Sequence, residues 1–84
     1  MLQAIQQLAS DLAKQINANK SEDGYTIVCT HLELHHMVGH RVKQDVDLHD
    51  AVHLFFDEME FEHGMFLTVS QYSDVVLDER PEEF

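Results

Sequence analysis

The chain has 84 residues and a formal net charge of −11, which results from 16 acidic and five basic side chains. A chain of this length forms a single small domain, residues 1–84, and its negative charge argues against nucleic acids and anionic membranes as direct partners. The one cysteine, Cys29, permits no internal disulfide. The absence of a leader or an apolar span in the sequence therefore favours a soluble protein in the reducing cytoplasm.

The first segment has apolar residues at helical spacing, opposite a face that is rich in glutamine. The apolar residues are Leu2, Ile5, Leu8, Ala9, Leu12, Ala13 and Ile16. This period predicts an amphipathic helix over residues 2–18, followed by a polar loop that ends at Gly24. The nearly uncharged surface of helix 2–18 also permits a homodimer through this helix, in a structural or assembly role.

The period then changes to two, which predicts a strand over residues 25–36. Gly39 in a three-residue turn would begin a hairpin with a second strand after residue 40. The expected cross-strand pairs are His36 with His40, Leu34 with Val42, Thr30 with Val46, Glu33 with Lys43 and His35 with Arg41. This register keeps the apolar residues on one face.

A second helix is predicted over residues 48–62, with Asp47 as its N-cap and Gly64 near its end. The alternative is a hairpin, because residues 58–62 alternate and Phe55 and Phe56 favour strands.

The remaining segments read as a strand at 65–72, a short fourth strand or packed turn at 75–77, and a frayed tail at 79–84. The expected fold is a single α+β domain in the order helix-strand-strand-helix-strand. Two helices would pack on a small, mainly antiparallel sheet.

The acidic residues are concentrated in the second half, where 12 of the 16 follow residue 44 and Arg80 is the only cation. The first half is balanced, since four acidic and four basic residues cancel. This asymmetry predicts a surface that docks on a basic protein. The candidate partner-binding residues are Asp50, Asp57, Glu58, Glu60, Glu62, Asp74, Asp78 and Glu79.

The leading hypothesis is therefore a small inhibitor that imitates nucleic acid and occupies the basic, nucleic-acid-binding site of a partner. Anti-CRISPR and anti-restriction proteins, antitoxins and immunity proteins share this size and charge, although no motif links the chain to any of them. Phe61, Phe66 and Tyr72 are candidate anchors, and each could equally belong to the core.

Seven histidines raise a second hypothesis, a site for a divalent transition metal. His49, His53 and Asp57 are spaced by one helical turn and would share a face of the second helix. A second group, His31, Glu33 and His35 with His36 and His40 near the turn, would lie too widely spaced on a strand for shared ligation. A solvated surface is the simpler interpretation of both groups, and no other cofactor is expected.

An enzyme is not expected from this sequence. Cys29 lies in an apolar strand, Ser70 and Ser73 lack a nucleophile elbow, and the three glycines form no phosphate-binding loop.

Overall fold

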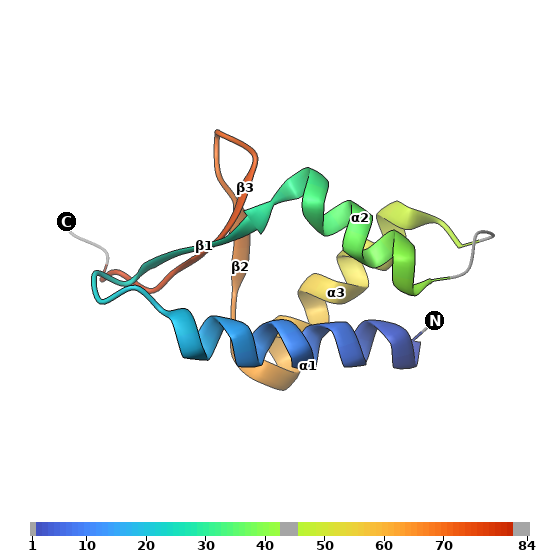
Figure 1. The fold of residues 1–84 in the computed structure, drawn as a ribbon, viewed down its shortest axis with the longest axis horizontal. Helices are drawn as coiled ribbons and strands as arrows, with labels where there is room; N and C mark the ends of the chain where they lie inside the picture. The colour runs from blue at the N-terminus through green and yellow to red at the C-terminus, as the bar shows by residue number, and fades with distance from the viewer. Residues whose placement is uncertain (1, 43–45, 82–84) are drawn as a thin grey trace.

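In the computed structural model, three helices pack beside a three-stranded antiparallel sheet within residues 2–42 and 46–81, the part of the chain that the structure describes (Figure 1). The elements are α1 (Leu2–Asn19), β1 (Tyr25–Thr30), α2 (His31–Arg41), α3 (Leu48–His63), β2 (Leu67–Val69) and β3 (Asp74–Asp78). The α+β class is confirmed. The predicted order differs in two respects: the helix α2 replaces the second strand, so there are three helices and not two, and β3 adds a strand at the predicted 75–77.

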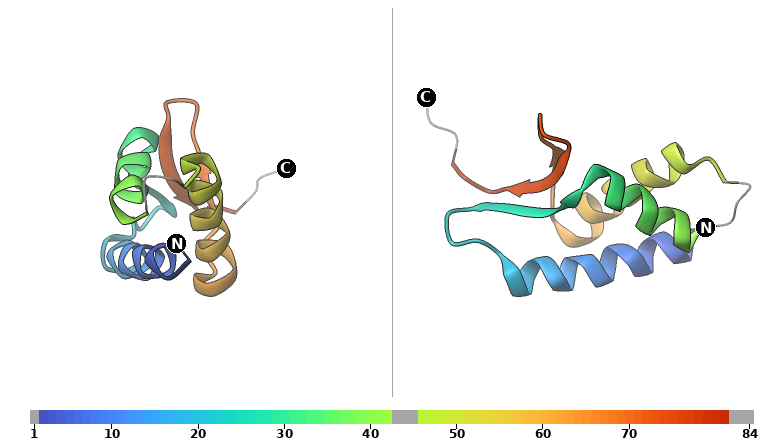
Figure 2. Two further views of the ribbon diagram at one scale, coloured as in Figure 1. Left: turned by 90° about the vertical axis from the view of Figure 1, so that its right-hand side faces the viewer. Right: turned by 45° about the horizontal axis from the view of Figure 1, so that its top comes forward.

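Helix α1 forms as predicted and supplies one wall of the core. Its buried residues are Ile5, Leu8, Ala9, Leu12, Ala13 and Ile16. Helix α1 packs mainly against α3, and α2 contacts α1 from another side (Figure 2). The apolar face of α1 is therefore used inside the chain, and the polar face is left for any contact with a second copy.

The largest correction concerns residues 31–41, which form α2 and not the continuation of a strand. Thr30 ends β1 and is also the N-cap of α2, so no loop residue separates the two elements. The Thr30 hydroxyl accepts a hydrogen bond from the Glu33 amide, and the Glu33 carboxylate accepts one from the Thr30 amide, both at 3.0 Å. This capping box satisfies two backbone donors that the start of a helix leaves unpaired.

The predicted hairpin fails because the apolar residues of this segment fit a helical period better than a strand period. Leu34 and Val38, one helical turn apart, are fully buried, whereas Leu32 is 66% exposed. The cross-strand pairs predicted between each of His36, Leu34, Thr30 and His35 and a residue of a second strand are therefore wrong. The partner proposed for Glu33, Lys43, lies outside the described residues.

Helix α3 confirms the second predicted helix and excludes the alternative hairpin. The Asp47 side chain accepts a hydrogen bond from the His49 amide at 2.9 Å, as an N-cap does. Gly64 ends the helix in the left-handed conformation, with φ 66° and ψ 23°. Between these caps, Ala51, Val52, Phe55 and Met59 are buried.

The sheet has the order β1-β3-β2, so β1 and β2 are both edge strands. Strand β2 is shorter than the predicted 65–72, and β3 includes the predicted 75–77. The pairing of β1 with β3 shifts between Ile27 and Cys29, which marks a β-bulge at Val28. The N–H of Glu79 donates to the Gly24 carbonyl at 2.7 Å, so the first residue of the predicted tail is held by a backbone hydrogen bond.

Gly39 gives a direct test of the helix at 31–41, and Gly64 at the end of α3 serves as the contrast. Gly39 lies in α2, and an added Cβ would make an ordinary contact with Leu48 at 3.9 Å, so we expect Gly39→Ala to raise the free energy of unfolding by about 0.5 kcal/mol. Gly64→Ala should lower it by about 1 kcal/mol, because alanine is strained at positive φ. Urea denaturation measures both changes. A destabilised Gly39→Ala variant would instead favour the hairpin turn.

Candidate functional site

A groove between α3 and β2 is the place where acidic and apolar side chains meet. Its volume is about 280 Å³. The residues that line it are His53, Phe56, Asp57, Glu60, Phe66, Leu67, Thr68 and Val69. The side of α3 supplies the carboxylates and the edge strand supplies the apolar floor. Helix α3 contains five acidic residues and neither lysine nor arginine, so the negative charge of its wall is not offset within the helix.

Three large aromatic side chains are exposed, as an anchor for a partner requires. Phe66 is 64% exposed at the groove, Phe61 is 76% exposed on α3, and Tyr72 is 78% exposed. Tyr72 lies in the β2–β3 turn, separate from the groove. The residues proposed as anchors are thus on the surface and not in the core, and Phe66 is the one beside the carboxylates.

The acidic residues predicted on α3 divide between two faces of the helix. Asp50, Asp57 and Glu60 are exposed and, with His53 between them, follow one another at spacings of three and four residues. They therefore form one stripe opposite the buried face of α3, which we call the acidic stripe. Glu58 is half-buried on another side of the helix, and Glu62 is exposed.

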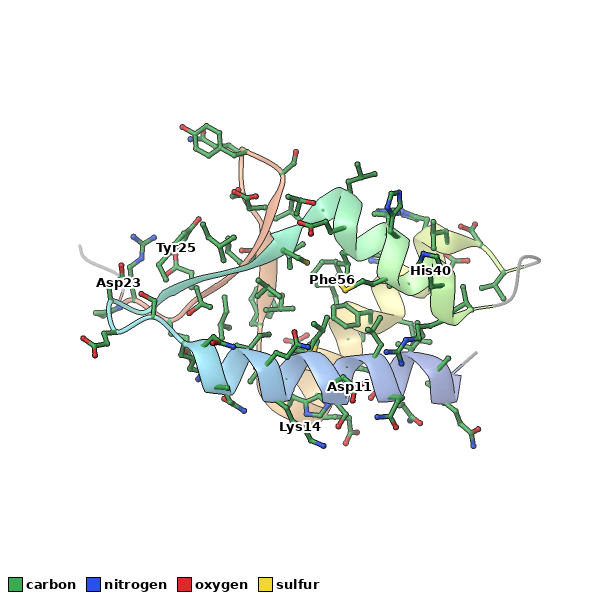
Figure 3. The ribbon with its side chains drawn as sticks, in the orientation of Figure 1. Asp11, Lys14, Asp23, Tyr25, His40 and Phe56 are labelled. Atoms are coloured by element: carbon green, nitrogen blue, oxygen red, sulfur yellow. The ribbon has the colours of Figure 1, made fainter. Side chains whose placement is uncertain are left out.

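The other three predicted residues do not join the acidic stripe. Asp74 begins β3 and is partly buried opposite Thr30 of β1. Asp78 and Glu79 lie at the turn that joins α1 to β1, where Asp23 and Tyr25 mark the end of the molecule distant from His40 (Figure 3). The eight predicted residues therefore lie on α3, at the start of β3 and at the turn before β1, and not on a single element.

Two of the carboxylates at this distant end are paired with cations. Arg80 donates two hydrogen bonds to Asp78, at 2.9 and 2.8 Å, and its guanidinium lies 4.6 Å from the centre of the Tyr25 ring. Lys20 pairs with Glu79 at 3.2 Å. The hydrogen bonds from Arg80 lower the pKa of Asp78 to about 2. Glu22 and Asp23 also lie at this end, so the two pairs offset only part of its negative charge.

Two grooves on the other side of the molecule have a different character. The groove between α1 and α2, about 450 Å³, contains charges of both signs, and Asp11 and Arg41 pair there at 3.4 Å. Asp11, Lys14 and His40 are the labelled residues of this groove in Figure 3. The groove between α1 and β1 is smaller, about 110 Å³, and lacks acidic or basic side chains. Only the groove between α3 and β2 combines acidic walls with an exposed aromatic ring among these three.

Histidines form two close pairs, of which the sequence indicated one. His49 and His53 of α3 approach within 3.2 Å between their Nε2 atoms, and His31 and His35 of α2 do the same. Among the described residues, no group of three histidine, cysteine or acidic side chains is arranged to hold a metal, so Asp57 does not complete the predicted triad.

The pattern of period two predicts a strand for this segment, on which His31 and His35 would lie four residues apart in an extended chain, and so it does not indicate the pair on α2. The capping box at Thr30 and Glu33 was the signal in the sequence that could have found it. The pKa of His35 is lowered, first by burial and then by His31, His49 and His36.

Cys29 is half-buried at the bulged edge strand. Burial, with smaller effects from Glu33 and Asp74, raises the pKa of its thiol to about 11. The thiol therefore remains protonated at neutral pH, whereas a nucleophilic cysteine reacts as the thiolate.

Comparisons with known proteins place no further residue in the site. No family model, curated protein or solved structure matches the chain. Within residues 2–42 and 46–81, none of the helices is both long and apolar enough to cross a membrane.

The pair of Asp78 and Arg80 gives a test of the electrostatics. Because the folded-state pKa of Asp78 is depressed, the pair stabilises the fold above the ordinary value of 3.8 and loses this effect as the pH falls toward 2. Arg80→Ala should therefore raise the pKa of Asp78 toward 3.8, measured by NMR titration of its carboxyl carbon. Lys20→Ala, which removes the neighbouring pair, should leave that pKa unchanged. Titration of wild-type Asp78 near 3.8 would contradict the pairing.

Proposed function

We propose that this chain is a small protein-binding inhibitor that docks the groove between α3 and β2 on a basic, nucleic-acid-binding site of a partner protein. The observation that carries the proposal is the position of Phe66, which is 64% exposed beside Asp57 and Glu60. An exposed aromatic ring next to uncompensated carboxylates supplies an apolar anchor and charge for steering at the same place.

The partner is argued from charge complementarity. The acidic stripe contains Asp50, Asp57 and Glu60, and α3 as a whole has no lysine or arginine to pair with them. A positively charged surface would relieve the repulsion among these carboxylates, whereas an acidic or neutral surface would not. The apolar floor of Leu67 and the exposed Val69 fits the aliphatic stems of lysine and arginine as well as their charged ends.

The charge density of α3 is suited to imitating one strand of nucleic acid. The acidic stripe carries three of the five carboxylates of α3, Asp50, Asp57 and Glu60, over about 15 Å of helix, so neighbouring charges on this face are on average roughly 7.5 Å apart. A single DNA strand has one per ~3.4 Å and a duplex one per ~1.7 Å. A site that holds a single strand is thus a closer electrostatic match to α3 than a site that holds a duplex.

The test begins with proteins captured by the tagged chain from its source cells at low salt. Each captured protein is purified and titrated with the wild type and with three variants, Asp57→Lys, Glu60→Lys and Phe66→Ala. We expect a basic partner whose affinity falls as salt rises and whose bound oligonucleotide is displaced by the wild type. Each variant should weaken binding about tenfold or more, because it removes a charge contact or the anchor.

Matched controls separate the groove from general charge and hydrophobicity. Glu22→Lys changes the net charge as much as Asp57→Lys but lies in the turn before β1, and Leu32→Ala removes a side chain that is 66% exposed, close to the 64% of Phe66. Both controls should bind as the wild type does. Equal losses in controls and groove variants, or an affinity that does not depend on salt, would refute the proposal.

A further inference from the structure

The two histidine pairs share one geometry although they lie on different helices. In each pair the Nε2 atoms are 3.2 Å apart, the ring centroids are 4.5 Å apart, and the ring planes cross at 83° on α2 and 81° on α3. Each pair is formed by residues one helical turn apart, so the helix backbone fixes their separation. In each pair the two Nε2 atoms are within hydrogen-bond distance, so one ring can donate its N–H to the nitrogen of the other.

This separation is the one that two imidazole ligands of a single metal ion adopt. Zinc–nitrogen bonds are about 2.0–2.1 Å, so two ligands of a tetrahedral ion have nitrogens roughly 3.3 Å apart. Two Nε2 atoms that both carry protons would repel one another at 3.2 Å, and so at least one has a free electron pair. A metal ion would use the electron pairs of both.

We infer that His31 with His35, and His49 with His53, are two chelating sites for borderline divalent ions that favour imidazole, of which zinc is the test case. The α2 pair is half-buried and the α3 pair is exposed. No third described side chain completes either site, so each supplies two ligands and leaves the other coordination positions to water. This inference does not depend on the proposed inhibitor function, although His53 also lines the groove.

The test is calorimetric titration of the purified chain with zinc chloride at pH 7.5. We expect the wild type to bind two ions per chain, and His31→Ala and His53→Ala each to reduce this to one. The double variant should lose both ions. Since each variant removes one nitrogen from one pair, the stoichiometry reports on the pairs separately.

His36→Ala and His63→Ala are the matched controls, because these histidines lie on the same two helices but outside the pairs. Both should still bind two ions. Circular dichroism shows that each variant is folded before titration. Unchanged uptake by the double variant, no uptake by the wild type, or the loss of both ions in either single variant would overturn the inference. None of these results would alter the salt dependence expected for the inhibitor.

Discussion

The capping box of Thr30 and Glu33 is the constraint on which the arrangement of the helices depends. It turns the chain from strand to helix between two consecutive residues, so the start of α2 is fixed relative to the sheet. A second hydrogen bond, from the His31 amide to the Ser73 carbonyl at 2.7 Å, ties the same point to the β2–β3 turn. With α2 fixed in this way, Leu34 and Val38 are buried in the core that α1 and α3 share.

The burial of one side of α3 determines what its other side can do. Phe55 and Met59 are fully buried, so Asp57, between them in sequence, must face outward. The acidic side chains on the outer side of α3 repel one another, and α3 has no lysine or arginine to offset them. At the far end, by contrast, Asp78 pairs with Arg80 and Glu79 pairs with Lys20. Within residues 2–42 and 46–81, cations therefore pair with two carboxylates at the far end and with none on α3. A uniform need for solubility does not explain this difference.

Much of the fold could be predicted from the sequence where a pattern extended over several turns. Helices α1 and α3 have long periodic faces, and the caps Asp47 and Gly64 are in the expected places. The α2 segment was ambiguous, because Leu32 and Leu34 fit a period of two while Leu34 and Val38 fit a helix. The site was predicted in part. Asp57, Glu60 and Phe66 come together, but the sheet order and the ion pair of Glu79 with Lys20 depend on contacts between distant residues that no local pattern encodes.

The bulge at Val28 has a consequence for how the molecule behaves at high concentration. Strand β1 is an edge with a neighbour on one side, and Ile27 on it is 59% exposed, which are features that promote fibril growth by strand stacking. The extra residue interrupts the even spacing of backbone donors and acceptors and increases the local twist. A strand from another molecule could not extend a continuous hydrogen-bond ladder along β1. The bulge therefore protects this exposed strand edge from polymerisation.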